Sequence, residues 1–195
     1  MMGSQNIPGT RFPSYLICGR LTTMLTIKSV EHVMEAWLKL KRQVPMRGAA
    51  ALEELTEVLE QVREALPDWR REVPEARGPY GRRVLFEAPW AELVLIHIPA
   101  GSATCIHDHG ASIGCGVVLE GSLVNRLYRL DEFGYPLLRG ERAIAEGGEY
   151  AAPIGQIHQL ANPGHSRAVS LHLYAPRLSA SKTYYPYEQV LDFVI

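Results

Sequence analysis

Residues 101–121 read GSATCIHDHGASIGCGVVLEG, and the rest of the chain can be understood from them. His107 and His109 are two residues apart in a segment of strand-like composition, so their side chains are expected on the same face of a sheet. A second stretch, residues 147–162 (GGEYAAPIGQIHQLAN), places His158 behind a Gly/Pro turn as a candidate third metal ligand. Three histidines without a neighbouring carboxylate would leave a divalent ion its full charge and free coordination positions.

The size and composition of the chain favour a single globular domain. It has 195 residues, of which 47% are hydrophobic and 21% are charged, which is enough for a sizeable core. A formal net charge of -1 gives no electrostatic reason to expect nucleic acid or an anionic membrane as a partner. We expect a small polar molecule as the ligand, and a monomer or weak homo-oligomer.

The cysteines and the N-terminal segment indicate the cellular setting. Cys18, Cys105 and Cys115 are odd in number and have no paired spacing, which argues against both a disulfide framework and a cysteine zinc site. A reducing cytoplasm fits this pattern. Residues 1–26 contain too short an apolar run for a signal peptide or a membrane span, and their Gly, Pro and Ser content predicts a loose arm. Residues 27–195 would then form the one domain.

Two segments within residues 29–70 show helical periodicity. Ser29 is a good N-cap for the first, and its apolar residues recur at intervals of three and four. The second has a longer apolar stripe that ends before Pro67. The two stripes are Val30, Val33, Met34, Trp37 and Leu38, and then Leu52, Leu55, Val58, Leu59, Val62 and Leu66.

From residue 80 to residue 176 the helical periodicity is replaced by short apolar or alternating runs between turn residues. Many short strands at this spacing are typical of a sandwich or a small barrel. The tail, residues 177–195, contains Tyr184, Tyr185 and Tyr187 and is expected to pack on the barrel exterior. The expected strands are 82–87, 92–98, 113–119, 122–130, 142–145, 157–160 and 168–174.

The two histidine stretches resemble the two motifs of the cupin family. The first motif is carried by Gly101, His107, His109 and Gly121, and the second by Gly147, Pro153, Gly155, His158 and Asn162. The second motif matches completely. The first departs from the family in one place, because cupins usually carry a metal-binding Glu a few residues after the second histidine and this chain has Gly114 there.

Within the cupins, the chain resembles the cysteine dioxygenases over residues 80–176. The resemblance rests on IHDH at 106–109, GQIH at 155–158 and SLHLY at 170–174. It implies a mainly β fold, a cupin jelly-roll β-barrel preceded by two N-terminal α-helices. It further implies one Fe(II) per chain held by the three histidines, with L-cysteine and O2 as substrates and L-cysteine sulfinate as product.

The strand 168–174 carries a polar set at alternate positions. Ser170, His172 and Tyr174 share one parity, and apolar residues hold the other. The resemblance implies that the polar set faces the active site, where Ser170 orients His172 and His172 hydrogen-bonds Tyr174. The alternative is an ordinary half-exposed strand with its polar side in water.

Substrate recognition is expected at Tyr80 and Arg82, which share a strand face. The resemblance implies that Arg82 pairs with the substrate carboxylate, as a planar guanidinium can do through two charge-assisted hydrogen bonds. The alternative is a surface arginine, the role we expect for Arg83, and a slip of one residue would exchange the two. Many animal members of the family crosslink a cysteine to the active-site tyrosine. Here Gly114 holds that position and Cys115 falls on the opposite face, so no crosslink is expected.

The remaining titratable residues are expected to be structural. His97 lies in an apolar strand, His32 and His165 should face solvent, and Asp108 should point away from the metal and make hairpin hydrogen bonds. Cys105 is expected to be buried as a small apolar residue. The Ala175-Pro176 bond is a candidate for a cis peptide, a bend often found in the family.

Three other functions remain open from sequence. One is a dioxygenase for another small thiol, such as 3-mercaptopropionate or cysteamine. Another is a zinc, nickel or manganese cupin that catalyses isomerisation or hydrolysis, since imidazole ligands do not select the metal. The last is a non-catalytic cupin that senses or stores a ligand.

Overall fold

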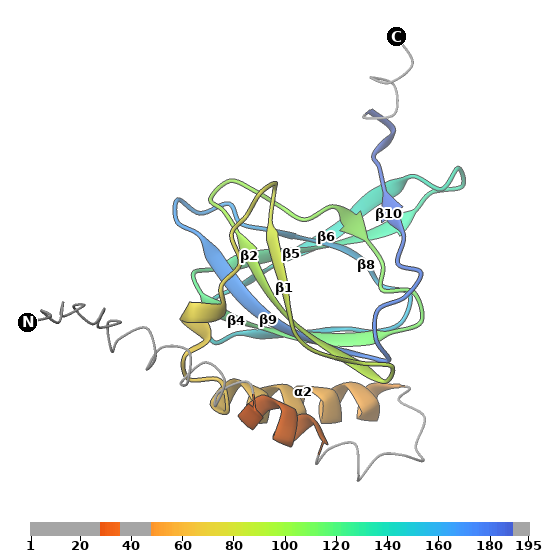
Figure 1. The fold of residues 1–195 in the computed structure, drawn as a ribbon. Coiled ribbons are helices and arrows are strands. Elements are labelled where there is room, and N and C mark those ends of the chain that lie inside the picture. The colour runs from red at the N-terminus through yellow and green to blue at the C-terminus, as the bar shows by residue number, and fades with distance from the viewer. Residues whose placement is uncertain (1–27, 36–47, 189–195) are drawn as a thin grey trace, which may run out of the picture.

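The computed structural model describes residues 28–35 and 48–188 (Figure 1). Residues 28–35 are helical, α2 spans Ala49–Glu64, and a short 3-10 helix follows at Trp69–Glu72. The predicted N-terminal arm and the second half of the first predicted helix lie outside the described residues. The strands are β1 (Gly81–Ala88), β2 (Ala91–Ile98), β3 (Ile106–His107), β4 (Ile113–Glu120), β5 (Leu123–Leu130), β6 (Pro136–Ile144), β7 (Glu149–Ala152), β8 (Ile157–Ala161), β9 (Ala168–Ala175) and β10 (Thr183–Tyr184).

The strands form two antiparallel five-stranded sheets that face each other. The first has the order β1-β2-β9-β4-β7 and the second the order β10-β3-β8-β5-β6. The two helices lie against the outer face of the first sheet (Figure 1). This arrangement confirms the predicted mainly β jelly-roll preceded by two N-terminal helices.

The central strand β9 is buried on both faces, which resolves the orientation of its polar residues. Val169, Leu171 and Leu173 pack with the apolar stripe of α2 in one hydrophobic cluster. Because α2 covers that side of the sheet, the alternate residues of β9 face the space between the two sheets. Ser170, His172 and Tyr174 are all at least 95% buried there, so the polar set lies inside the molecule and the half-exposed alternative is wrong.

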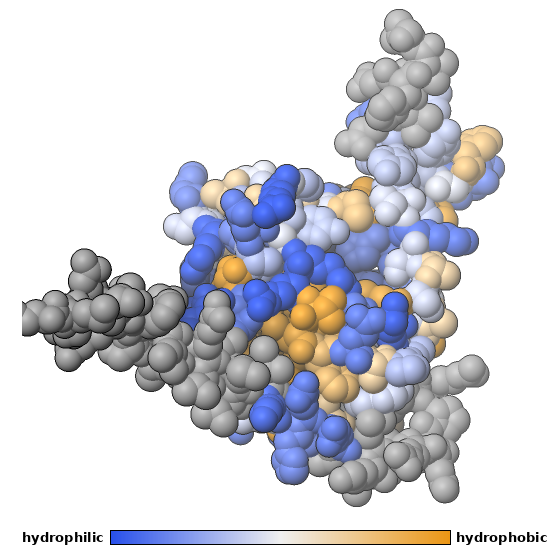
Figure 2. All heavy atoms as spheres, viewed as in Figure 1, coloured by the Kyte–Doolittle hydropathy of each residue, from blue (hydrophilic) through white to orange (hydrophobic). Residues whose placement is uncertain are grey.

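One face of the molecule carries a small hydrophobic area. On the face shown in Figure 2, hydrophobic residues gather where β1 passes above the helices, within a mainly hydrophilic surround. Val84 of β1 is 37% exposed, and its neighbours Leu85 and Phe86 are half-buried. In the part of the chain that the structure describes, no helix is long and apolar enough to cross a membrane.

Several strands differ from the sequence prediction at their ends. β6 begins at Pro136 rather than 142, and the short strands β7 and β10 were not predicted. β10 comes from the tail, where Thr183 pairs with His107 and Tyr184 pairs with Ile106 of β3. Cys105 directly precedes the short strand β3 and is exposed, so its predicted burial is wrong. The Ala175-Pro176 bond is cis.

A carboxyl pair joins α2 to the first sheet and predicts a pH dependence of stability. The side chains of Glu60 on α2 and Glu149 on β7 are hydrogen-bonded, and this bond together with partial burial raises the pKa of Glu149 to about 7. A carboxyl group whose pKa is raised by folding stabilises the folded state at low pH and loses that contribution as pH rises through the folded value.

The Tm of the wild type relative to that of Glu149→Gln should therefore be higher at pH 5.5 than at pH 8, because the opposite pH dependence of the buried histidines is common to both proteins and cancels. Because the pair is partly exposed, we expect no more than about 1 kcal/mol. Glu146→Gln, on the preceding turn, is the matched control. An unchanged pH dependence in Glu149→Gln would contradict the assignment.

Candidate metal centre

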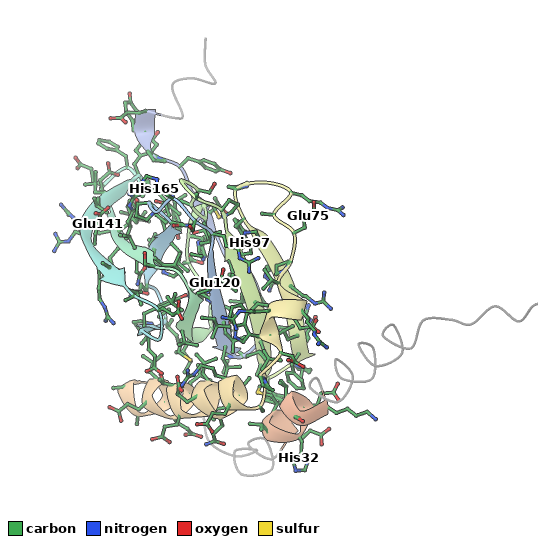
Figure 3. All side chains as sticks on the ribbon, turned by 90° about the vertical axis from the view of Figure 1, so that its left-hand side faces the viewer. His32, Glu75, His97, Glu120, Glu141 and His165 are labelled. Carbon is green, nitrogen blue, oxygen red and sulfur yellow. The ribbon has the colours of Figure 1, made fainter. Side chains whose placement is uncertain are left out.

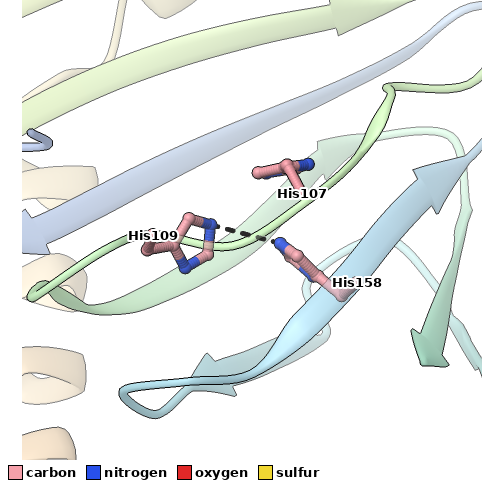
Figure 4. A group of neighbouring side chains, drawn as sticks. All are labelled: His107, His109 and His158. Carbon is pink, nitrogen blue, oxygen red and sulfur yellow. Dashed lines mark hydrogen bonds between the residues drawn. The ribbon is translucent and has the colours of Figure 1, made fainter. Parts of the chain in front are cut away.

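Three histidine rings from two parts of the chain converge between the two sheets (Figure 4). His107 is on β3, directly opposite His158 of β8, and His109 lies in the turn after β3. The ring centroids are 4.8 to 5.2 Å apart, and one nitrogen from each residue lies within 4.8 Å of the others. The three residues could thus hold one metal ion, although His109 reaches the group from the turn rather than from the strand that was expected.

The ring nitrogens are arranged as metal ligands require. His158 and His107 each direct Nδ1 at an oxygen 2.9 Å away, the side-chain oxygen of Asn125 and the carbonyl oxygen of Cys105. If Nδ1–H donates in both cases, the Nε2 lone pairs are left for a cation. The Nε2 atoms of His158 and His109 are 3.2 Å apart. Two nitrogens about 2.1 Å from one ion and at right angles would be about 3 Å apart.

Burial favours the neutral form of His109 and His158, whereas at His107 the effect of burial is outweighed by the contacts with Cys105, which raise its pKa. Burial, with a contribution from the neighbouring His107, lowers the pKa of His109 to about 4. Burial also lowers the pKa of His158 well below its ordinary value. In addition, Nδ1 of His109 is buried without a hydrogen-bond partner among the described residues. Clustered neutral imidazoles with inward lone pairs suit a divalent transition metal.

A phenol ring lies against the position at which cupins usually carry a carboxylate. Gly114 of β4 is paired with Tyr174 of β9, and a Cβ atom at Gly114 would lie 2.7 Å from the Tyr174 ring. The ring of Tyr174 in turn is 4.9 Å from the ring of His109. In the described part of the chain the metal-ligand group contains three histidines and no acidic residue.

Asp108, between two of the histidines, holds the turn and the tail together. Its Oδ1 accepts hydrogen bonds from the backbone N–H groups of Gly110 at 3.0 Å and Lys182 at 2.9 Å. The hydroxyl of Tyr184 donates to Oδ2 at 2.7 Å. One of these hydrogen bonds lies within the turn and two reach the tail, so the Asp108 carboxylate is engaged away from the three histidine rings, as expected.

His172 is the centre of a buried hydrogen-bonded group beside the histidine cluster. Its Nε2 lies 2.7 Å from the hydroxyl oxygen of Ser170. Its Nδ1 lies 3.3 Å from the hydroxyl of Tyr174 and 2.8 Å from that of Tyr150. Burial, followed by the nearby imidazoles, lowers the pKa of His172 to about 3, so its ring is neutral. The expected contact of His172 with Ser170 is present, Tyr174 lies farther away than the hydroxyl of Tyr150, and Tyr150 is an addition.

The two predicted substrate-binding residues lie near this group. Tyr80 is half-buried and packs against the hydrophobic residues between the sheets. Arg82 forms an ion pair with Glu92, whose side chain is 5% exposed, while that of Arg82 is 36% exposed. Glu92 is paired with Tyr174 across β2 and β9, so the ion pair lies beside the Tyr174 side chain. Arg83 instead pairs with Glu72 at 2.7 Å, away from the site.

Cys115 lies on the opposite side of β4 from Tyr174. It packs in the cluster beneath α2, and its sulfur is 3.9 Å from the carbonyl oxygen of Leu173. Burial raises the pKa of its thiol to about 12. We therefore expect the intact mass of the purified protein to match the sequence, with no loss of two hydrogens, and iodoacetamide to modify the exposed Cys105 before Cys115. A mass lower by two hydrogens would show a Cys-Tyr crosslink.

The other histidines lie outside the group. His32 and His165 are exposed and lie near opposite ends of the molecule (Figure 3). His97 is half-buried, and its Nδ1 is 2.9 Å from the carbonyl oxygen of Pro74, which suits the structural role predicted for it.

Three neighbours of the site were not identified from sequence: Glu92, Asn125 and Tyr150. The signal for Glu92 is that it is the one acidic residue in β2, a strand that is apolar apart from Glu92 and His97. Tyr150 lies within the second histidine stretch, at a position that alternates with Ala152 toward the interior. Asn125 carries no comparable signal, because its role depends on the pairing of β5 with β8.

Two solved structures are similar to this chain, and the first of them supports the fold. The chain resembles an uncharacterised conserved protein with a double-stranded β-helix domain from Klebsiella pneumoniae subsp. pneumoniae MGH 78578, with 18% identity and a TM-score of 0.50, over 59% of this chain and 87% of that chain. It also resembles TT1209 from Thermus thermophilus, with 25% identity and a TM-score of 0.49, over 56% of this chain and 95% of that chain.

Comparison with family models is more specific. The model described as cysteine dioxygenase type I matches residues 29–186, which include the helices, both sheets and all three histidines. The match therefore covers the whole arrangement described above. The chain belongs to the cysteine dioxygenase type I family.

Proposed function

We propose that this protein is a cysteine dioxygenase that oxidises the thiol of L-cysteine to the sulfinate with O2 at one Fe(II) held by His107, His109 and His158. The observation that carries the proposal is the convergence of these three imidazoles without a carboxylate in the group. Membership of the cysteine dioxygenase type I family supports both the metal and the thiol substrate. The odd cysteine count supports the cytoplasm as the setting.

The chain supplies the ligand set, and the ion supplies the redox chemistry. Fe(II) bound by the three histidines would acidify a thiol and allow four electrons to pass from its sulfur to O2, both of whose oxygen atoms end on that sulfur. Hydrophobic residues around the site, among them Val94 and Leu160, exclude water from it. Asn125 holds His158 in the orientation that a ligand needs.

Arg82 would bind the substrate carboxylate at the margin of the site. The guanidinium has five N–H donors, and its bond to Glu92 uses one of them, so donors remain for a second carboxylate. Tyr174 offers a hydroxyl beside His109 that can donate a hydrogen bond to a substrate or to the product oxygens. The buried contact between Ser170 and His172 would hold the inner face of β9, which also carries Tyr174, in position.

A second candidate, a dioxygenase for another small thiol, is favoured by Glu92. This buried carboxylate offsets the charge of Arg82 and could itself bind a substrate ammonium group. Cysteamine has the ammonium group and lacks the carboxylate, and 3-mercaptopropionate has the reverse. Rates on these two thiols relative to L-cysteine separate the alternatives.

The direct test is to load the purified protein with Fe(II), supply L-cysteine, and measure sulfinate formed per O2 consumed. We expect a 1:1 ratio, with both oxygen atoms of labelled O2 found in the sulfinate. Turnover that continues without O2 would instead indicate a metal-dependent isomerase or hydrolase. Binding of the thiol without product under any metal would indicate a non-catalytic cupin.

A further inference from the structure

We propose that Tyr150 is a positioning residue that occupies Nδ1 of His172 and thereby leaves the hydroxyl hydrogen of Tyr174 free for a molecule bound beside the three histidines. The inference deepens the proposed dioxygenase function and rests on it for its kinetic part. Its structural part, which concerns the hydrogen bonds of His172, stands on the contacts alone.

Tyr150 and His172 lie in one row of paired residues across the first sheet. Tyr150 of β7 pairs with Gly116 of β4, and Gly116 pairs with His172 of β9, so that the three lie side by side across the sheet. The Tyr150 ring lies over Gly116, where a Cβ atom would be 2.6 Å from it. The glycine therefore lets the phenol of one strand reach the imidazole two strands away.

The hydroxyl of Tyr150 donates its hydrogen to His172. Tyr150 is 6% exposed, and in the described part of the chain His172 is the hydrogen-bond partner of its hydroxyl. A buried phenol must donate its hydrogen, because an unmade hydrogen bond is costly. Nδ1 of His172 is therefore the acceptor. In the neutral ring Nε2 then carries the hydrogen and donates it to Ser170 at 2.7 Å.

The hydroxyls of Tyr150 and Tyr174 compete for Nδ1 of His172. An imidazole nitrogen has one lone pair in the ring plane, yet the hydroxyls of both Tyr150 and Tyr174 lie near this atom, at 2.8 and 3.3 Å. The shorter distance is ideal for a hydrogen bond and the longer one is beyond the usual range. Tyr150 therefore takes the lone pair, and the hydrogen of Tyr174 has no full acceptor within the described residues.

The consequence falls on Tyr174, which lies beside the proposed metal site. Its ring lies over the other glycine of β4, Gly114, with its centroid 4.9 Å from that of His109. Burial raises the pKa of Tyr174 above its ordinary value, so the phenol keeps its hydrogen. Without Tyr150, Tyr174 would turn this hydrogen to His172. With Tyr150 in place, the hydrogen can serve a substrate or product oxygen.

The structural test compares crystal structures of the wild type and Tyr150→Phe, both without added substrate. Removal of the competing hydroxyl should shorten the Tyr174 to His172 Nδ1 distance from 3.3 Å to about 2.8 Å. An unchanged distance would overturn the inference. Gly116→Ala, which displaces the Tyr150 ring, should give the same shift. This arm does not depend on activity or on the metal.

The kinetic test uses the Fe(II)-loaded enzymes with L-cysteine. Tyr150→Phe should lower kcat by about 3- to 10-fold with KM within twofold, as expected for one neutral hydrogen bond. In a Tyr174→Phe background the same substitution should have no further effect, since Tyr150 acts through Tyr174. An equal loss in both backgrounds would indicate a merely structural role and overturn the inference.

A matched control shows whether the effect is specific to the hydroxyl of Tyr150 or follows from the loss of any tyrosine hydroxyl. Tyr128 of β5 is half-buried, with its hydroxyl 3.3 Å from the side-chain oxygen of Gln159, and Tyr128→Phe should leave kcat and the Tyr174 distance unchanged. If the wild type oxidises no thiol, the proposed function fails, while the distance in Tyr150→Phe still decides the inference.

Discussion

Replacing His158 by Gln is expected to lower Fe(II) affinity by more than about 100-fold and to abolish thiol oxidation, because removal of even an outer partner of a ligand costs 10- to 100-fold. His158 is 1% exposed, and its Nε2 is 3.2 Å from that of His109, so this ring is central to the cluster. Metal content after dialysis and sulfinate formation are the two measurements.

The control for this substitution is His165→Gln, because His165 is exposed and outside the cluster. It should bind Fe(II) and oxidise L-cysteine as the wild type does. Since His158 is also buried, circular dichroism and Tm establish that the variant is folded. A folded His158→Gln protein that keeps stoichiometric iron and full turnover would refute the three-histidine centre.

Replacing Arg82 by Ala is expected to lower kcat/KM for L-cysteine at least about tenfold, from the loss of ~1.5–3 kcal/mol for hydrogen bonds to a charged group. The rate on cysteamine, which lacks the carboxylate, should fall far less. The ratio of the two rates is the measurement, because a general loss of folded protein affects both substrates equally. An unchanged ratio would refute carboxylate recognition by Arg82.

The ion pair with Glu92 makes a second variant necessary. Arg82→Ala leaves the buried carboxylate of Glu92 without its cation, and an unpaired buried charge is strongly destabilising. Adding Glu92→Gln to Arg82→Ala should recover much of the Tm but not the rate on L-cysteine. Recovery of both would show that Arg82 acts on stability alone.

The fold and the metal ligands were predictable because their signals are local. The alternation of polar and apolar residues in 168–174 places three polar side chains on one face whatever the strand pairs with. The spacing of His107, His109 and His158 within two short motifs carried the family resemblance without knowledge of the register. The absence of a crosslink was likewise predicted from the offset between Gly114 and Cys115, and mass measurement will test it.

The features that the sequence did not predict depend on contacts between segments far apart in the chain. Cys105 is exposed because β3 is short and the tail strand β10 lies at the edge of the sheet, which no local pattern reveals. The pairing of Arg82 with Glu92 follows from the β1 and β2 register, which is shifted between Val84 and Phe86. The reach of Tyr150 to His172 depends on the glycine of the strand between them.

Periodicity in the sequence by itself thus determined two helices followed by a β sandwich or small barrel. The resemblance carried by the two histidine motifs narrowed this to the jelly-roll class and indicated the three candidate ligands. Only the tertiary structure decided which side chains meet across the sheets: Asn125 behind His158, Glu92 on Arg82 and Tyr150 on His172. The physical reason is that strand register, which brings distant residues within hydrogen-bonding distance, is set by the packing of the whole barrel and the helices on it.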